Sequence, residues 1–203
     1  MNALYTRTFE NALAFLYGLN KEQLKDIERK YNESLTDSTV KVERKEPIWD
    51  FFKKQGFITG FTANTCEVNL FTQDSYDNKL LLNSAADYEG NVAMCDPHFT
   101  DYISDFNEWQ GPYAHVRRCL YKKDTFEYNF EHTRALWKAY PNERKAMFMS
   151  FMDMHEGTYT VVKHLDKPLA AFLREMEAQN TTVILFSDHG PHLSGIKAVL
   201  GYE

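Results

Sequence analysis

The first part of the chain places apolar and charged residues at helical spacing. Residues 9–17 form an apolar run, with Thr8 placed to cap its start and Gly18 placed to end it. Residues 21–31 place apolar side chains at i, i+3 and i+7 on one face, with charged residues between them. The pattern therefore predicts two helices, followed by a polar loop over 32–46.

The middle of the chain predicts one helix and strand, and then a long irregular region. Pro47 opens a short helix over 48–55, and 57–62 has the β-branched and aromatic residues typical of a strand. From about 66 to 128 the sequence is aromatic and acidic with scattered Gly and Pro. We expect only short helices and turns in this insertion.

The last third of the chain alternates apolar runs with helical patterns. A helix is expected over 130–140, and 146–152 is a continuous apolar run typical of a strand buried on both faces. An amphipathic helix over 165–178 separates it from a second apolar run at 182–186. Strand, helix and strand in this order form a βαβ unit. The fold class is therefore α/β, with a mostly parallel sheet and helices on both faces.

Composition narrows the possible functions. The 203 residues, 43% of them apolar, are enough for one domain or part of one. A net charge of -6 argues against nucleic acid as the binding partner. No apolar run reaches the roughly 20 residues that span a bilayer, and residues 1–7 lack the pattern of a signal peptide. The disulfide state and redox compartment stay open for three cysteines, Cys66, Cys95 and Cys119.

Metal-binding residue types follow both predicted C-terminal strands. The groups, in chain order, are Asp153, His155 and Glu156, and then Asp188, His189 and His192. Ligands of open parallel sheets bind at the carboxyl ends of the strands, so we expect both groups to face one crevice. Carboxylate and imidazole together suit Zn²⁺, Mn²⁺ or a similar ion. The alternative for the second group is a turn in which the Asp side chain bonds only the backbone.

Several stretches resemble the alkaline phosphatase superfamily, which includes sulfatases, nucleotide pyrophosphatase/phosphodiesterases and phosphoglycerol or phosphoethanolamine transferases. The run TVILFSDHG at 182–190 resembles its metal-binding strand end. The run TFENALAFLYGL at 8–19 is similar to the nucleophile helix of the phosphodiesterase branch, with Glu10 where that pattern has Pro. HEGTYT at 155–160 and the run downstream most resemble the sulfatase-like family called domain of unknown function 229.

This resemblance implies roles for the residues around one metal ion. Thr8 would be the nucleophile and a metal ligand, together with Asp188 and His189. Asn11 would donate to a non-bridging oxygen of a bound phosphoryl or sulfuryl group. The alternative for Thr8 is a simple helix cap.

The roles of the other candidates follow less directly from the resemblance. His155 would be a second-metal ligand or a substrate contact, with Asp153 and Glu156 beside it; Asp153 is also a candidate metal ligand. Asp153 and His155 are two residues apart, whereas two-metal members have a spacing of four, which fits single-metal relatives at least as well. His192 would line the pocket or lie in an exposed loop.

The implied protein is a three-layer α/β sandwich that hydrolyses or transfers phosphate or sulfate esters with a divalent ion, Zn²⁺, Mn²⁺ or Ca²⁺. Its substrate would be a small-molecule, glycan or lipid ester, and its location secretory or extracellular. A conventional sulfatase is disfavoured because no Cys-x-Pro-x-Arg stretch is present. The family's first strand would precede Thr8 and further strands would follow 203, so 1–203 is expected to be a single partial domain. The alternative is an inactive fragment or a binding module on the same scaffold.

Overall fold

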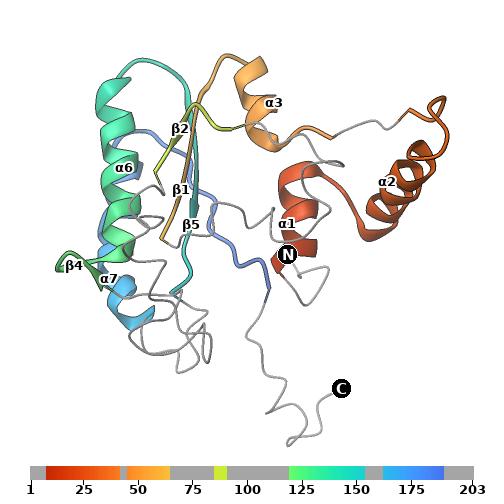
Figure 1. Cartoon of the computed structure of the whole chain (residues 1–203). Coiled ribbons are helices and arrows are strands. Elements are labelled where there is room, and N and C mark those ends of the chain that lie inside the picture. The colour runs from red at the N-terminus through yellow and green to blue at the C-terminus, as the bar shows by residue number, and fades with distance from the viewer. Residues whose placement is uncertain (1–7, 42–44, 65–84, 91–118, 154–161, 190–203) are drawn as a thin grey trace, which may run out of the picture.

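The computed structural model describes residues 8–41, 45–64, 85–90, 119–153 and 162–189 (Figure 1). Its helices are α1 (Thr8–Tyr17), α2 (Lys21–Ser34), α3 (Ile48–Lys54), α6 (Thr125–Ala139) and α7 (Val162–Ala178). Its strands are β1 (Ile58–Ala63), β2 (Tyr88–Glu89), β3 (Cys119–Leu120), β4 (Lys123–Asp124) and β5 (Lys145–Ser150). The five predicted helices are therefore confirmed, with α6 starting at Thr125 rather than at 130. Most of the predicted insertion lies outside the described residues, as do Cys66 and Cys95, whereas Cys119 is a free, exposed thiol.

Three of the strands form a parallel sheet in the order β2-β1-β5. Residues of β1 and β5 pair in register over six positions, from Ile58 with Lys145 to Ala63 with Ser150. The chain passes from β1 to β5 through α6, so this parallel pair is built around a crossover helix. The predicted α/β class with a parallel sheet is confirmed. β3 and β4 form a separate antiparallel pair.

Helices cover both faces of this sheet (Figure 1). On one face, Met149 of β5 packs against the cluster formed by α6 and α7. On the other face, the ring of Phe148 lies 6.1 Å from Trp49 of α3 and 6.3 Å from Phe15 of α1, measured between centroids. Successive residues of β5 therefore point to opposite helical layers, as the period of a strand requires.

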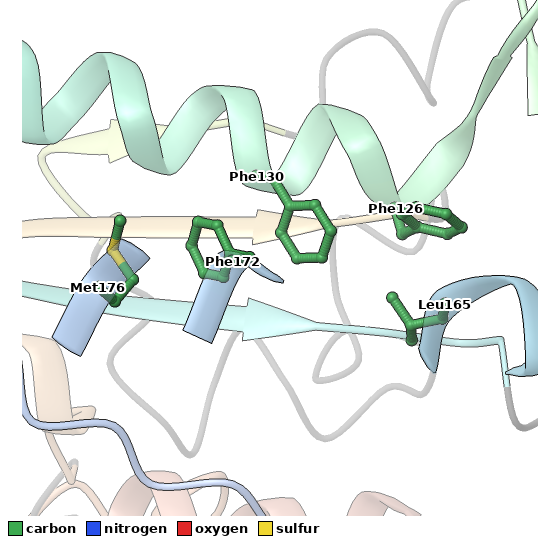
Figure 2. Packing of buried hydrophobic residues seen from close by; sticks show 5 residues of the cluster. All are labelled: Phe126, Phe130, Leu165, Phe172 and Met176. Carbon is green, nitrogen blue, oxygen red and sulfur yellow. The ribbon is translucent and has the colours of Figure 1, made fainter. Parts of the chain in front are cut away.

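The apolar core between α6 and α7 consists of five buried side chains, shown in Figure 2: Phe126, Phe130, Leu165, Phe172 and Met176. The rings of Phe130 and Phe172 stack with centroids 4.5 Å apart. Arg134 of α6 closes the edge of this cluster by forming an ion pair with Glu175 of α7 at 2.7 Å. The helical spacing of these residues placed α7 correctly, because one apolar stripe had to face the sheet layer.

The prediction of a buried strand over 182–186 is wrong. The segment has no strand pairing, and four of its side chains are 44–77% exposed: Val183, Ile184, Leu185 and Phe186. It runs on from α7 past β5 toward α1, and the ring of Phe186 lies 4.4 Å from that of Phe15 (Figure 1). An apolar run indicates a preference for burial, but burial as a strand also needs a hydrogen-bonded neighbour and a covering layer. Among the described residues, β1 is the only strand that pairs with β5.

A close contact attaches the 85–90 segment to α6. The ring of His132 lies so near Gly90 that a Cβ on Gly90 would be 2.4 Å from its Cγ. Its Nε2 is buried and has no hydrogen-bond partner among the described residues. Burial lowers the pKa of His132 below its ordinary 6.5, although a hydrogen bond with the backbone of Tyr88 acts in the opposite direction.

Candidate site at the carboxyl end of the parallel sheet

Two polar residues follow β1 and β5 where these parallel strands end together. Asn64 comes directly after β1 and is 3% exposed. Asp153 comes three residues after the end of β5 and is 2% exposed. Because the two strands pair in register up to Ala63 and Ser150, the chain brings both side chains to the same edge. This is the edge at which open parallel sheets bind ligands.

The side chain of Asn64 connects the two strand ends. Its Nδ2 donates a hydrogen bond of 2.7 Å to Oδ2 of Asp153. Its Oδ1 accepts a hydrogen bond of 2.9 Å from the backbone N–H of Met152. The same Nδ2 lies 3.4 Å from Oγ1 of Thr125, the first residue of α6. One amide therefore holds the turn after β5 and the start of a helix.

The carboxyl group of Asp153 lies in an environment that opposes its charge. Burial raises its pKa above the ordinary 3.8, and the nearby Asp124 acts in the same direction. The hydrogen bonds from Asn64 and from the backbone N–H of Asp153 lower the pKa in part. A buried carboxylate is costly unless it is paired or binds a cation, so this group favours either a proton or a positive partner.

Helix α6 supports this edge with a buried polar row. The hydroxyl of Thr62 on β1 donates to Oδ1 of Asn129 at 2.9 Å. Nδ2 of Asn129 donates to the backbone carbonyl of Ser150 on β5 at 2.9 Å. Asn129 is 0% exposed, so both halves of its amide are satisfied inside the protein. The helix is thereby tied to both strands just before they end.

The second predicted group lies at the end of the extended segment that follows α7. Nε2 of His189 lies 3.4 Å from Oδ2 of Asp188, and their side chains are 10% and 36% exposed. The hydroxyl of Ser187 donates to the backbone carbonyl of His189. Imidazole and carboxylate thus lie side by side, on the part of the chain that approaches α1 through Phe186.

Comparison with known proteins adds one match, to the family described as "Protein of unknown function (DUF229)", over residues 1–200. The chain belongs to the DUF229 family. DUF229 is a sulfatase-like family. No curated protein and no solved structure matches this chain.

The structure of this DUF229 member brings some of the predicted residues together and separates others. Asp188 and His189 are adjacent, but they do not join Asp153 in one cluster. Within the described ranges, no three His, Cys, Asp or Glu side chains gather closely enough to hold a metal ion. Thr8 is the first residue of α1, and Asn11, one turn later, is 7% exposed. The remaining candidates lie outside the described residues: His155, Glu156 and His192.

Sequence reasoning missed the polar residues that support this edge in the DUF229 chain. Asn64 follows a predicted strand, which was a usable signal, because polar residues at the ends of parallel strands often carry function. Thr125 lies inside the region predicted to be irregular, from about 66 to 128, and Asn129 lies just before the helix predicted over 130–140. Their spacing of four places them on one face of a helix, a signal that is visible once α6 is known to start at Thr125.

In the described part of the chain, none of the helices is long and apolar enough to cross a membrane.

Proposed function

We propose that this protein is a metal-dependent hydrolase or transferase that acts on phosphate or sulfate esters through a threonine nucleophile. The observation that supports the proposal is the pair formed by Asp188 and His189, in which Nε2 of the imidazole lies 3.4 Å from Oδ2 of the carboxylate. Carboxylate and imidazole are side chains that bind Zn²⁺ and Mn²⁺. The sulfatase-like character of DUF229 supports the same chemistry.

The donor set fits a divalent ion such as Zn²⁺, Mn²⁺ or Ca²⁺. Asp188 and His189 would hold one ion together with Thr8, whereas Asp153 does not join this pair in one group among the described residues. Carboxylate oxygens and imidazole nitrogens are ligands of Zn²⁺ and Mn²⁺, and the oxygens also suit Ca²⁺. When bound, such an ion would lower the pKa of a coordinated hydroxyl and offset charge that develops on the ester oxygens.

The chain's own residues would perform the group transfer at the start of α1. Oγ1 of Thr8 would attack phosphorus or sulfur as the ester oxygen leaves, and water would later release the group from Thr8. The first N–H groups of a helix favour an anion at this position. The amide of Asn11 would donate to a non-bridging oxygen, and His155, Glu156 and His192 would contact the leaving group or a second ion.

The substrate class is set by the group that is transferred, a phosphoryl or sulfuryl group. A small-molecule, glycan or lipid ester would present one phosphoryl or sulfuryl group to this edge. Its identity would be set by residues of the aromatic insertion over 66–128, which carries many side chains able to stack on sugar or lipid groups.

Metal titration of the full chain tests the proposal directly. Protein stripped with EDTA is titrated with Zn²⁺, Mn²⁺ and Ca²⁺ by calorimetry, and melting temperature is followed in parallel. We expect binding that Asp188→Ala or His189→Ala weakens at least about tenfold, because each removes a ligand. The control is Asp166→Ala, which removes an exposed carboxylate from α7. A wild-type chain that binds none of the three ions would overturn the proposal.

Turnover separates an enzyme from a binding module. The metal-loaded protein is assayed with aryl phosphate monoesters, aryl phosphodiesters and aryl sulfates. We expect Thr8→Ala to abolish hydrolysis and Thr8→Ser, which keeps a hydroxyl, to retain part of it. Metal binding without turnover of any ester class would favour a binding module instead.

A further inference from the structure

We propose that the 85–90 segment is a pH-sensitive clip, which stays docked on β1 and α6 while the imidazole of His132 is neutral and is released when that imidazole takes up a proton. The segment contains β2, which lies at one end of the strand order β2-β1-β5. Release uncovers the edge of β1 that the docked segment covers. The inference concerns a conformational change and does not depend on the metal or ester chemistry proposed above.

The ring of His132 has room for a neutral imidazole but no partner for a protonated one. A neutral imidazole carries a single N–H, which the hydrogen bond with the backbone of Tyr88 uses. The other nitrogen, Nε2, is buried and has no hydrogen-bond partner among the described residues. Protonation places a second N–H and a positive charge at this atom, where burial without an acceptor is costly. Movement of the segment away from the ring would give Nε2 access to water.

The direction of the pH effect follows from this arrangement. Burial lowers the pKa of His132 below its ordinary 6.5, and the hydrogen bond with the backbone of Tyr88 opposes the shift only in part. The docked form therefore binds the proton less tightly than the released form does. Docking is favoured fully above pH 6.5 and weakens as the pH falls from 6.5 toward the lowered value, by up to about tenfold for each pH unit.

The segment has a second anchor that does not change over this pH range. Oδ2 of Asp87 accepts hydrogen bonds from the N–H and the hydroxyl of Thr59, at 2.9 Å and 2.8 Å, and Oδ1 lies 3.5 Å from Nζ of Lys53. Burial acts to raise the pKa of Asp87, but these bonds and the charge of Lys53 outweigh it and hold the pKa below 3.8. The other carboxylate of the segment, Glu89, is exposed to solvent, which screens its charge.

The neighbouring positions of α6 and β1 offer no charge to balance a protonated ring. The residues of α6 three and four positions from the histidine are uncharged: Tyr128, Asn129, Ala135 and Leu136. The hydroxyl of Tyr128 donates to a backbone carbonyl of β3, and that of Tyr140, directly after α6, bonds the tyrosine hydroxyl of β2. Glu131 pairs with Lys123 at 2.7 Å, and residues 60–62 of β1 are uncharged.

Gly90 is the point at which docking can be measured. Its N–H donates to the carbonyl of Phe61 on β1 at 2.8 Å, and its carbonyl lies 3.2 Å from Oγ1 of Thr62. A Cβ at this position would lie 2.4 Å from Cγ of His132, an atom one bond away from the Cβ that fixes the ring to α6. The ring and the segment therefore cannot both keep their places if either needs more room.

Backbone hydrogen exchange of the full chain tests the inference without any substitution. The protection of the Gly90 N–H, relative to its exchange rate in a free peptide at the same pH, is measured from about pH 7.5 to about pH 5. We expect this protection to fall by up to about tenfold for each pH unit below 6.5. The N–H of Ile58, which donates to the carbonyl of Arg144 at 2.9 Å, is the internal control and should keep its protection.

Three variants sharpen the test. His132→Gln, which is neutral at every pH, should remove the pH dependence at Gly90, whereas His164→Gln, at an exposed position of α7, should leave it as in the wild type. Gly90→Ala should give low protection at position 90 throughout the range, because its Cβ cannot fit against the ring.

Any of three results would overturn the inference. The protection of the Gly90 N–H could stay constant across the pH range, so that the ring takes up its proton without release of the segment. His132→Gln could retain the pH dependence of the wild type. Gly90 and Ile58 could also lose protection equally, which would mean that the whole sheet loosens rather than the 85–90 segment alone.

Discussion

Helix α6 has two buried sides of opposite chemistry. Toward α7 it buries the rings of Phe126 and Phe130 in an apolar cluster. Toward β1 and β5 it buries a polar row, Thr125, Asn129 and Thr133, each 0–2% exposed. The hydroxyl of Thr133 is satisfied by the backbone carbonyl of Asn129 and by the sulfur of Met149. One helix thus joins a layer that excludes water to a layer that pairs polar groups.

The two buried sides of α6 contribute in different ways: the apolar side stabilises the fold, and the polar side fixes the positions of neighbouring groups. Apolar packing has no fixed direction and stabilises in proportion to the area removed from water. Hydrogen bonds add less net stability, but they fix distances and angles, and a buried polar group that loses its partner is costly. We therefore expect variants on the α7 side to change stability alone, and variants on the strand side to affect the candidate site as well.

The largest effect is expected for Phe172→Ala. This ring is 1% exposed and stacks on Phe130, so its removal leaves a cavity that costs about 3–5 kcal/mol in the free energy of unfolding. Phe51→Ala is the control, because that ring is 59% exposed and its loss should cost under about 0.5 kcal/mol. Urea unfolding measures both. Metal affinity should be unchanged in Phe172→Ala, and a large loss there would break the separation between the two sides.

The next effect is expected for Asn129→Ala. Thr62 and the carbonyl of Ser150 each lose a hydrogen-bond partner in the protein interior, which costs about 1–3 kcal/mol in the free energy of unfolding. Asn142→Ala, on an exposed turn, serves as the comparison. A loss as small as that of the exposed residue, seen by urea unfolding, would mean that the polar row contributes nothing to stability.

An intermediate effect with a distinct pH dependence is expected for Asp153→Asn. Because the folded-state pKa of Asp153 is raised, the folded chain holds its proton at pH values where the unfolded chain releases it. The contribution of Asp153 to stability is thus present below its ordinary pKa of 3.8 and is lost as pH rises through the raised value. In EDTA-treated protein, the loss is about 1.4 kcal/mol for each unit by which the pKa is raised.

The asparagine variant should therefore lose less stability than the wild type as the pH rises above about 4. Urea unfolding across that pH range measures the difference, with Asp166→Asn as the exposed control. Identical pH profiles for Asp153→Asn and the wild type would show that the carboxyl group is not buried in the way described.

The smallest effect is expected for Glu175→Gln at the rim of the α7 side. The ion pair with Arg134 is 2.7 Å long, but its side chains are 44% and 37% exposed, so solvent screens it. We expect a loss of about 0–1 kcal/mol that shrinks further in 0.5 M salt. Thermal unfolding at low and high salt measures it. A loss of stability that does not depend on salt would mean that the Arg134–Glu175 pair is shielded from solvent, contrary to its exposure.

The helices and two strands of this fold were predictable because their signals are local. Gly18 and Gly56 end α1 and α3 in left-handed conformations, with φ of 64° and 76°, as their place after an apolar run predicts. Asn20 caps α2 through a reciprocal pair of hydrogen bonds with Gln23. Such helix ends and caps depend on a few residues that are neighbours in the sequence, so they can be predicted from the sequence alone.

Strand pairing and the buried polar contacts could not be predicted, because they join residues that are far apart in the sequence. Which edge of β5 is paired depends on β1, more than 80 residues earlier, and the apolar run at 182–186 carries no information about its partner. Asn64 and Asp153 are likewise 89 positions apart. Asp188 and His189 were placed side by side by adjacency alone, and their roles in binding stay predictions.

The contact between His132 and Gly90 gives the protein a built-in spectroscopic reporter. Burial lowers the pKa of His132, and the ring lies against Gly90, so release of the 85–90 segment would expose the ring and return its pKa toward 6.5. The ring-proton resonances of His132, followed against pH, therefore report whether β2 is docked on the sheet. This measurement uses the unaltered protein and changes no residue of the candidate site.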